Sequence, residues 1–79
     1  MIAFTEKLIK DESLTPAAKV FYLWLQQQKE DVLNSGNAFF ALQFDVTTMT
    51  INNWLFSLED AGYISISYYK RNRKITCNY

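Results

Sequence analysis

Residues 40–64 read FALQFDVTTMTINNWLFSLEDAGYI, and this stretch decides the fold of the chain. Two apolar, helix-forming runs are separated by only a few residues at FDVT. Thr47 can cap the second run, and Gly62 stands where a left-handed residue commonly ends a helix. The pattern predicts a short helix over residues 38–44, a tight turn, and a longer helix from residue 48 to about 61. The expected core face of the longer helix is Ile51, Trp54, Leu55 and Leu58.

A further helix is expected upstream, from residue 16 to about 29. Thr15 can cap its first turn, and Pro16 suits the first helical position because its missing N–H has no helical partner there. The apolar residues that follow have helical spacing: Ala17, Val20, Phe21, Trp24 and Leu25. Tyr22 and Leu23 widen this apolar stripe, which predicts a helix buried on more than one side.

The segments on either side of this helix carry weaker signals. Residues 1–13 mix apolar and charged positions and are expected to form an N-terminal arm, extended or weakly helical. The apolar side chains of this arm that should lie on the body are Ile2, Phe4, Leu8 and Ile9. Residues 31–37 (DVLNSGN) are rich in turn formers and are expected to form a loop, with Asn37 capping the helix over 38–44.

Residues 63–79 change to the alternation of β-strands, around a polar KRNR at 70–73. A two-stranded hairpin with a charged tip is therefore expected. A hairpin alone is barely stable in water, so its apolar side chains should face the helices: Ile64, Ile66, Ile75 and Cys77. The expected fold is α+β and mainly α, a single domain over residues 1–79 with three helices within 15–61 and a hairpin over 63–79.

Composition narrows the possible functions. The 79 residues include no histidine and one cysteine, Cys77, which excludes a structural zinc site and a disulfide framework. No apolar run approaches the roughly 20 residues of a membrane span, and the first residues lack the pattern of a signal peptide, so a cytoplasmic location is expected. Without a histidine base, an activated nucleophile or a glycine-rich phosphate loop, we expect no enzyme, cofactor or small-molecule substrate.

The net charge of zero hides an asymmetry. Residues 1–69 carry four basic and eight acidic residues, a net charge of −4. Residues 70–79 carry a charge of +4 and no acid, from Lys70, Arg71, Arg73 and Lys74. Positive charge gathered at one place favours a local anionic partner.

Several short motifs in this chain resemble those of bacterial winged helix-turn-helix DNA-binding proteins. They are Phe40-Ala41, Val46-Thr47, Met49-Thr50-Ile51 and the run LEDAGYI at residues 58–64. The run LTPAAKVFY at residues 14–22 resembles the first helix of the plasmid and phage replication-initiator branch. Asp45 stands where the family usually has glycine, but aspartate tolerates the left-handed conformation. The resemblance implies DNA binding in replication initiation or transcription regulation, with the third helix in the major groove and the hairpin as a basic wing.

The candidate DNA-binding residues fall on two elements. On the third helix, Thr47 caps the N-terminus and leaves N–H groups of the first turn free to bind a phosphate. Four side chains on the outward face of this helix can contact base edges: Thr48, Met49, Asn52 and Asn53. On the hairpin, the same four cations can contact phosphates or the minor groove, and Tyr68 and Tyr69 can stack on unpaired bases. Alternatively, neither element binds DNA. The helix face is then an ordinary solvent-exposed surface, and the charges of the hairpin only prevent its strand edges from pairing with another chain.

Two features oppose simple duplex binding. The third helix carries no Lys or Arg, and Glu59 and Asp60 lie in its last turns. Phe56 is expected on its outward face beside Met49, and exposed apolar patches commonly mark protein contacts. Besides duplex and single-stranded DNA, the sequence therefore leaves open a module that docks a protein partner or a second copy of itself. A dimer would double the available phosphate contacts.

Overall fold

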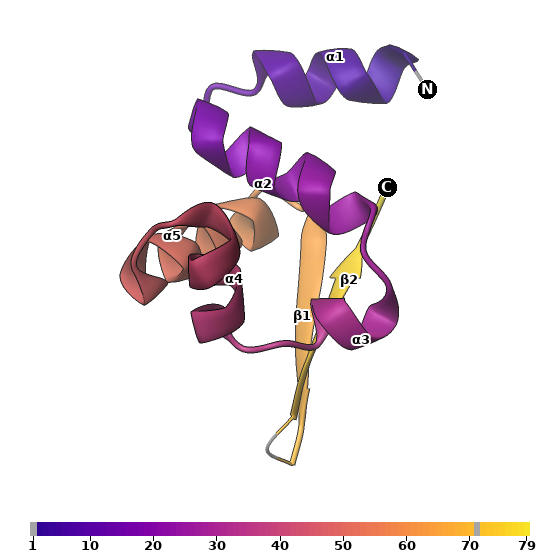
Figure 1. The fold of residues 1–79 in the computed structure, drawn as a ribbon. Helices are drawn as coiled ribbons and strands as arrows, with labels where there is room; N and C mark the ends of the chain where they lie inside the picture. The colour runs from indigo at the N-terminus through magenta and orange to yellow at the C-terminus, as the bar shows by residue number, and fades with distance from the viewer. Residues whose placement is uncertain (1, 71) are drawn as a thin grey trace.

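The computed structural model describes residues 2–70 and 72–79, which form five α-helices followed by a two-stranded antiparallel hairpin. The elements are α1 (Ile2–Lys10), α2 (Pro16–Gln26), α3 (Glu30–Leu33), α4 (Asn37–Phe44), α5 (Thr48–Asp60), β1 (Ile64–Tyr69) and β2 (Asn72–Cys77). In Figure 1, α1 lies along the top beside α2, and the strands of the hairpin extend downward, away from α1 and α2. The expected mixed α+β class is confirmed.

Threonine caps begin the two longest helices, as expected from the sequence. The Ala18 N–H donates to Thr15 Oγ1 at 3.1 Å, at the start of α2. The Thr50 N–H donates to Thr47 Oγ1 at 3.2 Å, at the start of α5. Each side chain satisfies a backbone donor that has no partner within its own helix.

Left-handed residues end α4 and α5. Asp45 follows α4 with φ of 54°, which confirms that aspartate adopts the conformation that the tight turn requires. Gly62 follows α5 with φ of 87°, and the Tyr63 N–H then donates to the Leu58 carbonyl at 2.9 Å. That bond closes a Schellman motif and directs the chain out of α5 into β1.

The expectation of three helices was wrong, because two more flank α2. The N-terminal arm is the helix α1, and α2 ends at Gln26, earlier than expected. The segment expected to be a loop begins with the short helix α3, whose Glu30 and Asp31 lie in the first turn, where negative charge favours a helix. Val32 and Leu33 of α3 pack against the core.

Two side-chain expectations in these segments were also wrong. Asn37 does not cap α4: Gly36 occupies the capping position, and Asn37 is the first helical residue. In α1, Leu8 is buried as expected, but Ile9 is exposed. The expectation for Ile2 and Phe4 falls on side chains outside the described part of the chain.

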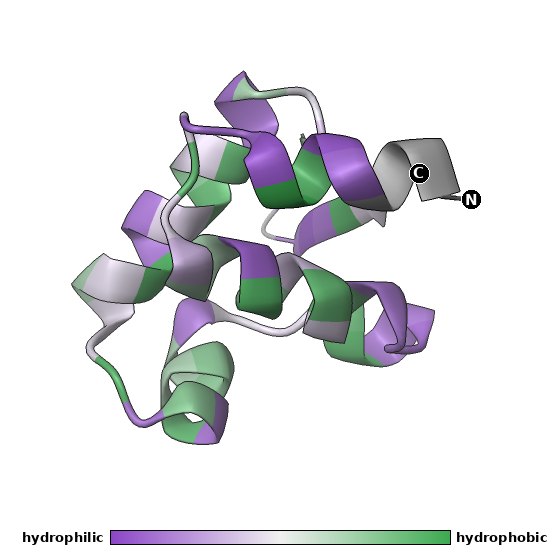
Figure 2. Ribbon diagram, turned by 90° about the horizontal axis from the view of Figure 1, so that it is seen from above, coloured by the Kyte–Doolittle hydropathy of each residue, from purple (hydrophilic) through white to green (hydrophobic). Residues whose placement is uncertain are grey.

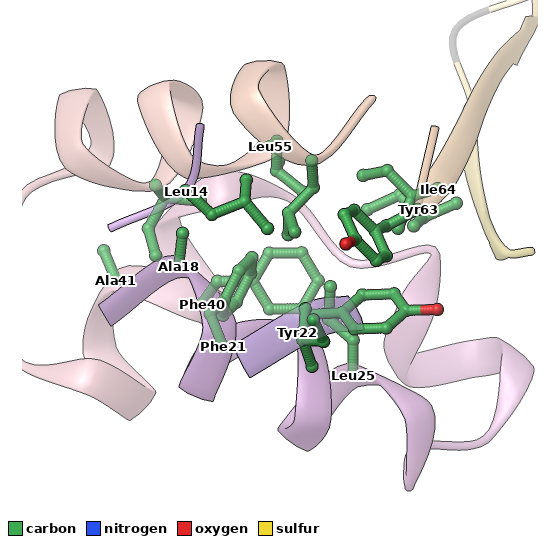
Figure 3. Close-up of a cluster of buried hydrophobic side chains, with 14 residues drawn as sticks. Leu14, Ala18, Phe21, Tyr22, Leu25, Phe40, Ala41, Leu55, Tyr63 and Ile64 are labelled. Carbon is green, nitrogen blue, oxygen red and sulfur yellow. The ribbon is translucent and has the colours of Figure 1, made fainter. Parts of the chain in front are cut away.

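The core lies where α2 meets α4, α5 and the start of β1. Figure 3 shows Leu14, Ala18 and Ala41 at one end of the buried cluster and Tyr22, Tyr63 and Ile64 at the other. Phe21 is fully buried, and its ring meets the edges of Phe40 at 5.6 Å and Phe44 at 5.1 Å. The expected core face of α5 is confirmed, with Ile51, Leu55 and Leu58 buried and Trp54 partly buried against them.

The hairpin buries its base against the helices. Ile64 pairs with Cys77 and Ile66 with Ile75. Ile64 and Ile75 are buried, while Ile66 and Cys77 are partly buried against the core, which confirms the expected facing. Burial raises the pKa of the Cys77 thiol.

Tyr63 joins the end of α5 to the loop after α1. Its ring is fully buried, and its hydroxyl donates to Asp11 Oδ2 at 2.9 Å. Burial, together with the carboxylate of Asp11, raises the pKa of Tyr63 to about 12. Hydrogen bonds, the largest from the Ser13 side chain, lower the pKa of Asp11.

The raised pKa of Tyr63 predicts alkaline destabilisation. Its contribution to stability is fully present below the unfolded tyrosine pKa of about 10, and it is lost as the pH rises through about 12. Urea unfolding at several alkaline pH values should show a steep fall in the wild type and a shallower one in Tyr63→Phe. Tyr69→Phe, which changes an exposed tyrosine, should retain the wild-type slope. Equal slopes in all three proteins would contradict the prediction.

Candidate nucleic-acid interface

The outward face of α5 presents uncharged side chains to solvent. Thr48, Met49, Asn52 and Asn53 are all exposed, as the sequence predicted, and so is Phe56. The Thr47 cap holds the N-terminus of the helix at the surface. Amide side chains on such a face can donate to and accept from base edges.

A groove of about 330 Å³ lies between α5 and the hairpin. Its lining comes from both elements: Asn52, Asn53, Leu55, Phe56 and Glu59 of α5, Ile66 and Tyr68 of β1, and Arg73 of β2. The structure thus brings part of the predicted helix face together with part of the predicted hairpin site. Thr47, Thr48 and Met49 do not line the groove.

Arg73 is turned toward the body of the protein. Its Nη1 donates to Asn37 Oδ1 and its Nη2 to the Ser35 carbonyl, both at 2.6 Å. Its guanidinium also lies 5.9 Å from the ring centroid of Phe40. Burial lowers the pKa of Arg73, although an arginine remains charged in proteins. Arg73 therefore fastens β2 to the α3–α4 connection and to the first residue of α4.

Lys70 and Lys74, the other hairpin cations that the structure describes, also lie apart from each other. The strands pair up to Tyr69 and Asn72, and Lys70 is the described residue of the turn between them. Lys74 lies within β2 and forms an ion pair with Glu30 at 3.3 Å. Lys70 is exposed in the turn with φ of 56°, and its Nζ lies 5.5 Å from the Tyr69 ring centroid.

The expectation of a four-cation tip was therefore wrong in its geometry. Arg73 and Lys74 belong to a strand and contact the body, Lys70 lies in the turn, and Arg71 lies outside the described residues. The strand alternation could have revealed the position of Arg73, because it shares a face of β2 with Ile75 and Cys77. No local signal identifies its partners Ser35 and Asn37, which lie 38 and 36 residues away in the sequence.

Other kinds of site find little support in the described residues. Across residues 2–70 and 72–79, no three His, Cys, Asp or Glu side chains come together to hold a metal ion. None of the helices in this part of the chain has the length and apolar character needed to cross a membrane. Comparison of the chain with protein-family models, curated proteins and solved structures found no match.

Proposed function

We propose that this chain is a winged helix-turn-helix DNA-binding protein that acts in phage- or plasmid-type replication initiation or in transcription regulation. In this proposal α4 and α5 are the helix-turn-helix and β1–β2 is the wing. The amino-terminal half of α5 enters the major groove, and the wing lies along the phosphate backbone. The element order and the left-handed turn at Asp45 support this assignment.

One observation carries the proposal: the exposed amides of α5 and the side chains of the wing line the same groove. A binding surface that combines base-edge and backbone contacts needs both elements on one side of the molecule. Asn52 and Asn53 can each bond adenine through two hydrogen bonds, and Met49 can contact a thymine methyl group.

The positions of the cations limit the electrostatic part of binding. Lys70 is exposed, and Lys74 can leave its solvent-exposed ion pair with Glu30 at little energetic cost. Arg73 is held by the body. With about two phosphate contacts per chain, the slope of log K against log salt should be about −2 for duplex DNA. Tight binding then requires two chains on paired half-sites.

The proposal is tested by titrating labelled duplexes of different sequence, at two salt concentrations, with the wild type, Asn52→Ala and Asn53→Ala. Loss of a two-bond amide contact should cost about 1–3 kcal/mol on a duplex that contains the preferred base pair, and much less on others. Gln27→Ala, which changes an exposed amide at the C-terminal cap of α2, is the matched control and should bind like the wild type. Absence of duplex binding, or equal losses on every sequence, would contradict the proposal.

A second candidate function is self-association through α4. Apolar side chains lie on several sides of this helix, and most of its length is hydrophobic (Figure 2). Leu42 is 80% exposed, and Phe39 is also exposed. The only charged residue from residue 32 to residue 58 is Asp45. In a twofold interface the same patch faces itself, so an uncharged patch avoids repulsion between like charges.

Sedimentation velocity over a range of protein concentrations distinguishes this candidate. If α4 is the interface, the wild type should form a dimer that Leu42→Lys dissociates, because the substitution buries two unpaired charges. Val20→Lys, at an exposed apolar position of α2, should leave the dimer intact. A wild type that remains monomeric at every concentration would rule the dimer out.

A further inference from the structure

The groove between α5 and the wing contains two aromatic side chains that the protein does not use for packing. Phe56 projects from α5 and Tyr68 from β1, and both line the groove. They are 67% and 75% exposed, and within residues 2–70 and 72–79 neither ring contacts another aromatic ring. In contrast, Phe21, Phe40, Phe44 and Trp54 all pack ring against ring.

The rest of the lining fits a flat, heteroaromatic ligand. Leu55 and Ile66 supply apolar surface, and Asn52 and Asn53 supply amide donors and acceptors. The carboxylate of Glu59 can accept from the amino group of a base, but it repels phosphate. Arg73 also lines the groove, but its guanidinium already donates to Asn37 and to the Ser35 carbonyl. A nucleotide is therefore expected to insert its base and to leave its phosphate outside the groove, away from Glu59.

The size of the groove supports the same occupant. A volume of about 330 Å³ lies at the low end of the range of about 300–1,000 Å³ for small-ligand pockets. It has room for an unpaired base with its sugar. Base-paired DNA presents only base edges in its grooves, so a base must leave the stack before aromatic side chains can cover its faces.

We propose that this groove binds one unpaired base, stacked on Phe56 and Tyr68, next to a duplex held by α5. The preferred ligand is then DNA with a single-stranded extension or a locally melted site. This inference rests on the proposed DNA-binding function and adds the strandedness of the target. It assigns base stacking to Tyr68 and not to Tyr69, which lies on the other face of β1.

Adjacent tyrosines provide a matched pair for the test. Tyr68 and Tyr69 are 75% and 72% exposed and are neighbours in the same strand, but only Tyr68 lines the groove. Fluorescence anisotropy would compare a blunt duplex with the same duplex carrying a short single-stranded tail. The tail should strengthen binding by the wild type about 5- to 150-fold, the contribution of one stacked base. Tyr68→Ala and Phe56→Ala should lose this gain, whereas Tyr69→Ala and Tyr68→Phe should keep it.

The outcomes separate the two proposals. If the tailed and blunt duplexes bind equally, or if Tyr68→Ala and Tyr69→Ala behave alike, the base-binding groove is refuted and duplex binding stands. If the wild type binds neither ligand, both proposals fail. A fluorescent 2-aminopurine in the tail gives a second readout, since stacking quenches it: its emission should fall on binding to the wild type and not to Tyr68→Ala. Circular dichroism melting of each variant confirms that it is folded.

Discussion

Phe21→Ala is expected to lower the free energy of unfolding by about 3–5 kcal/mol, the usual cost of deleting a buried phenylalanine. The ring is fully buried at the centre of an aromatic cluster, where it meets Phe40, Phe44 and Trp54 with centroid distances of 5.1–5.6 Å. These partners belong to α4 and α5, which cannot close a space as large as a benzene ring without losing their own packing. A domain of 79 residues has about 4–12 kcal/mol of stability in total, so this substitution removes much of it.

Urea unfolding followed by tryptophan fluorescence measures this effect, because Trp24 and Trp54 both contact the Phe21 ring. Val20→Ala is the matched control: it removes apolar atoms from the neighbouring position of α2, where the side chain is 58% exposed. It should change the unfolding free energy by less than about 0.5 kcal/mol. A Phe21→Ala variant as stable as Val20→Ala would show that the aromatic cluster is not the core.

The sequence predicts α2 and α5, which begin at threonine caps, and also α4, which has no side-chain cap, but it misses the four-residue helix α3. Thr15, Thr47 and Gly62 act through contacts within a few residues of themselves, so their effects can be anticipated from local chemistry. No side-chain cap begins α3, which has only four residues and depends on packing of Val32 and Leu33 against the core. Such packing is a tertiary effect that local propensity does not contain.

The candidate site was also predicted only in part, because some of its contacts are local and others depend on tertiary structure. Helical periodicity places Asn52, Asn53 and Phe56 on the outward face of α5, and the structure agrees. Charge counting along the chain treats Lys70, Arg73 and Lys74 as equivalent, but their surroundings differ. Arg73 donates to Ser35 before α4 and to Asn37 at its start, and Lys74 pairs with Glu30 of α3. These contacts depend on how the hairpin docks onto the helices.

Arg73→Met is expected to lower the free energy of unfolding by about 2–3 kcal/mol, because it removes two hydrogen bonds from a charged donor. Methionine retains much of the apolar stem, so the loss reports on the guanidinium. Lys74→Met is the matched control on the same strand. Its solvent-exposed ion pair with Glu30 should contribute less than about 1 kcal/mol.

The same variants distinguish a structural cation from one that contacts DNA. Lys70→Ala should leave stability unchanged but reduce the steepness of log K against log salt by about 0.9, the loss of one phosphate contact. Arg73→Met should leave that slope as it is, because the guanidinium is already bound to Ser35 and Asn37. Its affinity should nevertheless fall, since the wing is no longer fastened beside α5. If Arg73→Met instead flattened the salt dependence at unchanged stability, the arginine would belong to the DNA contact and not to the fold.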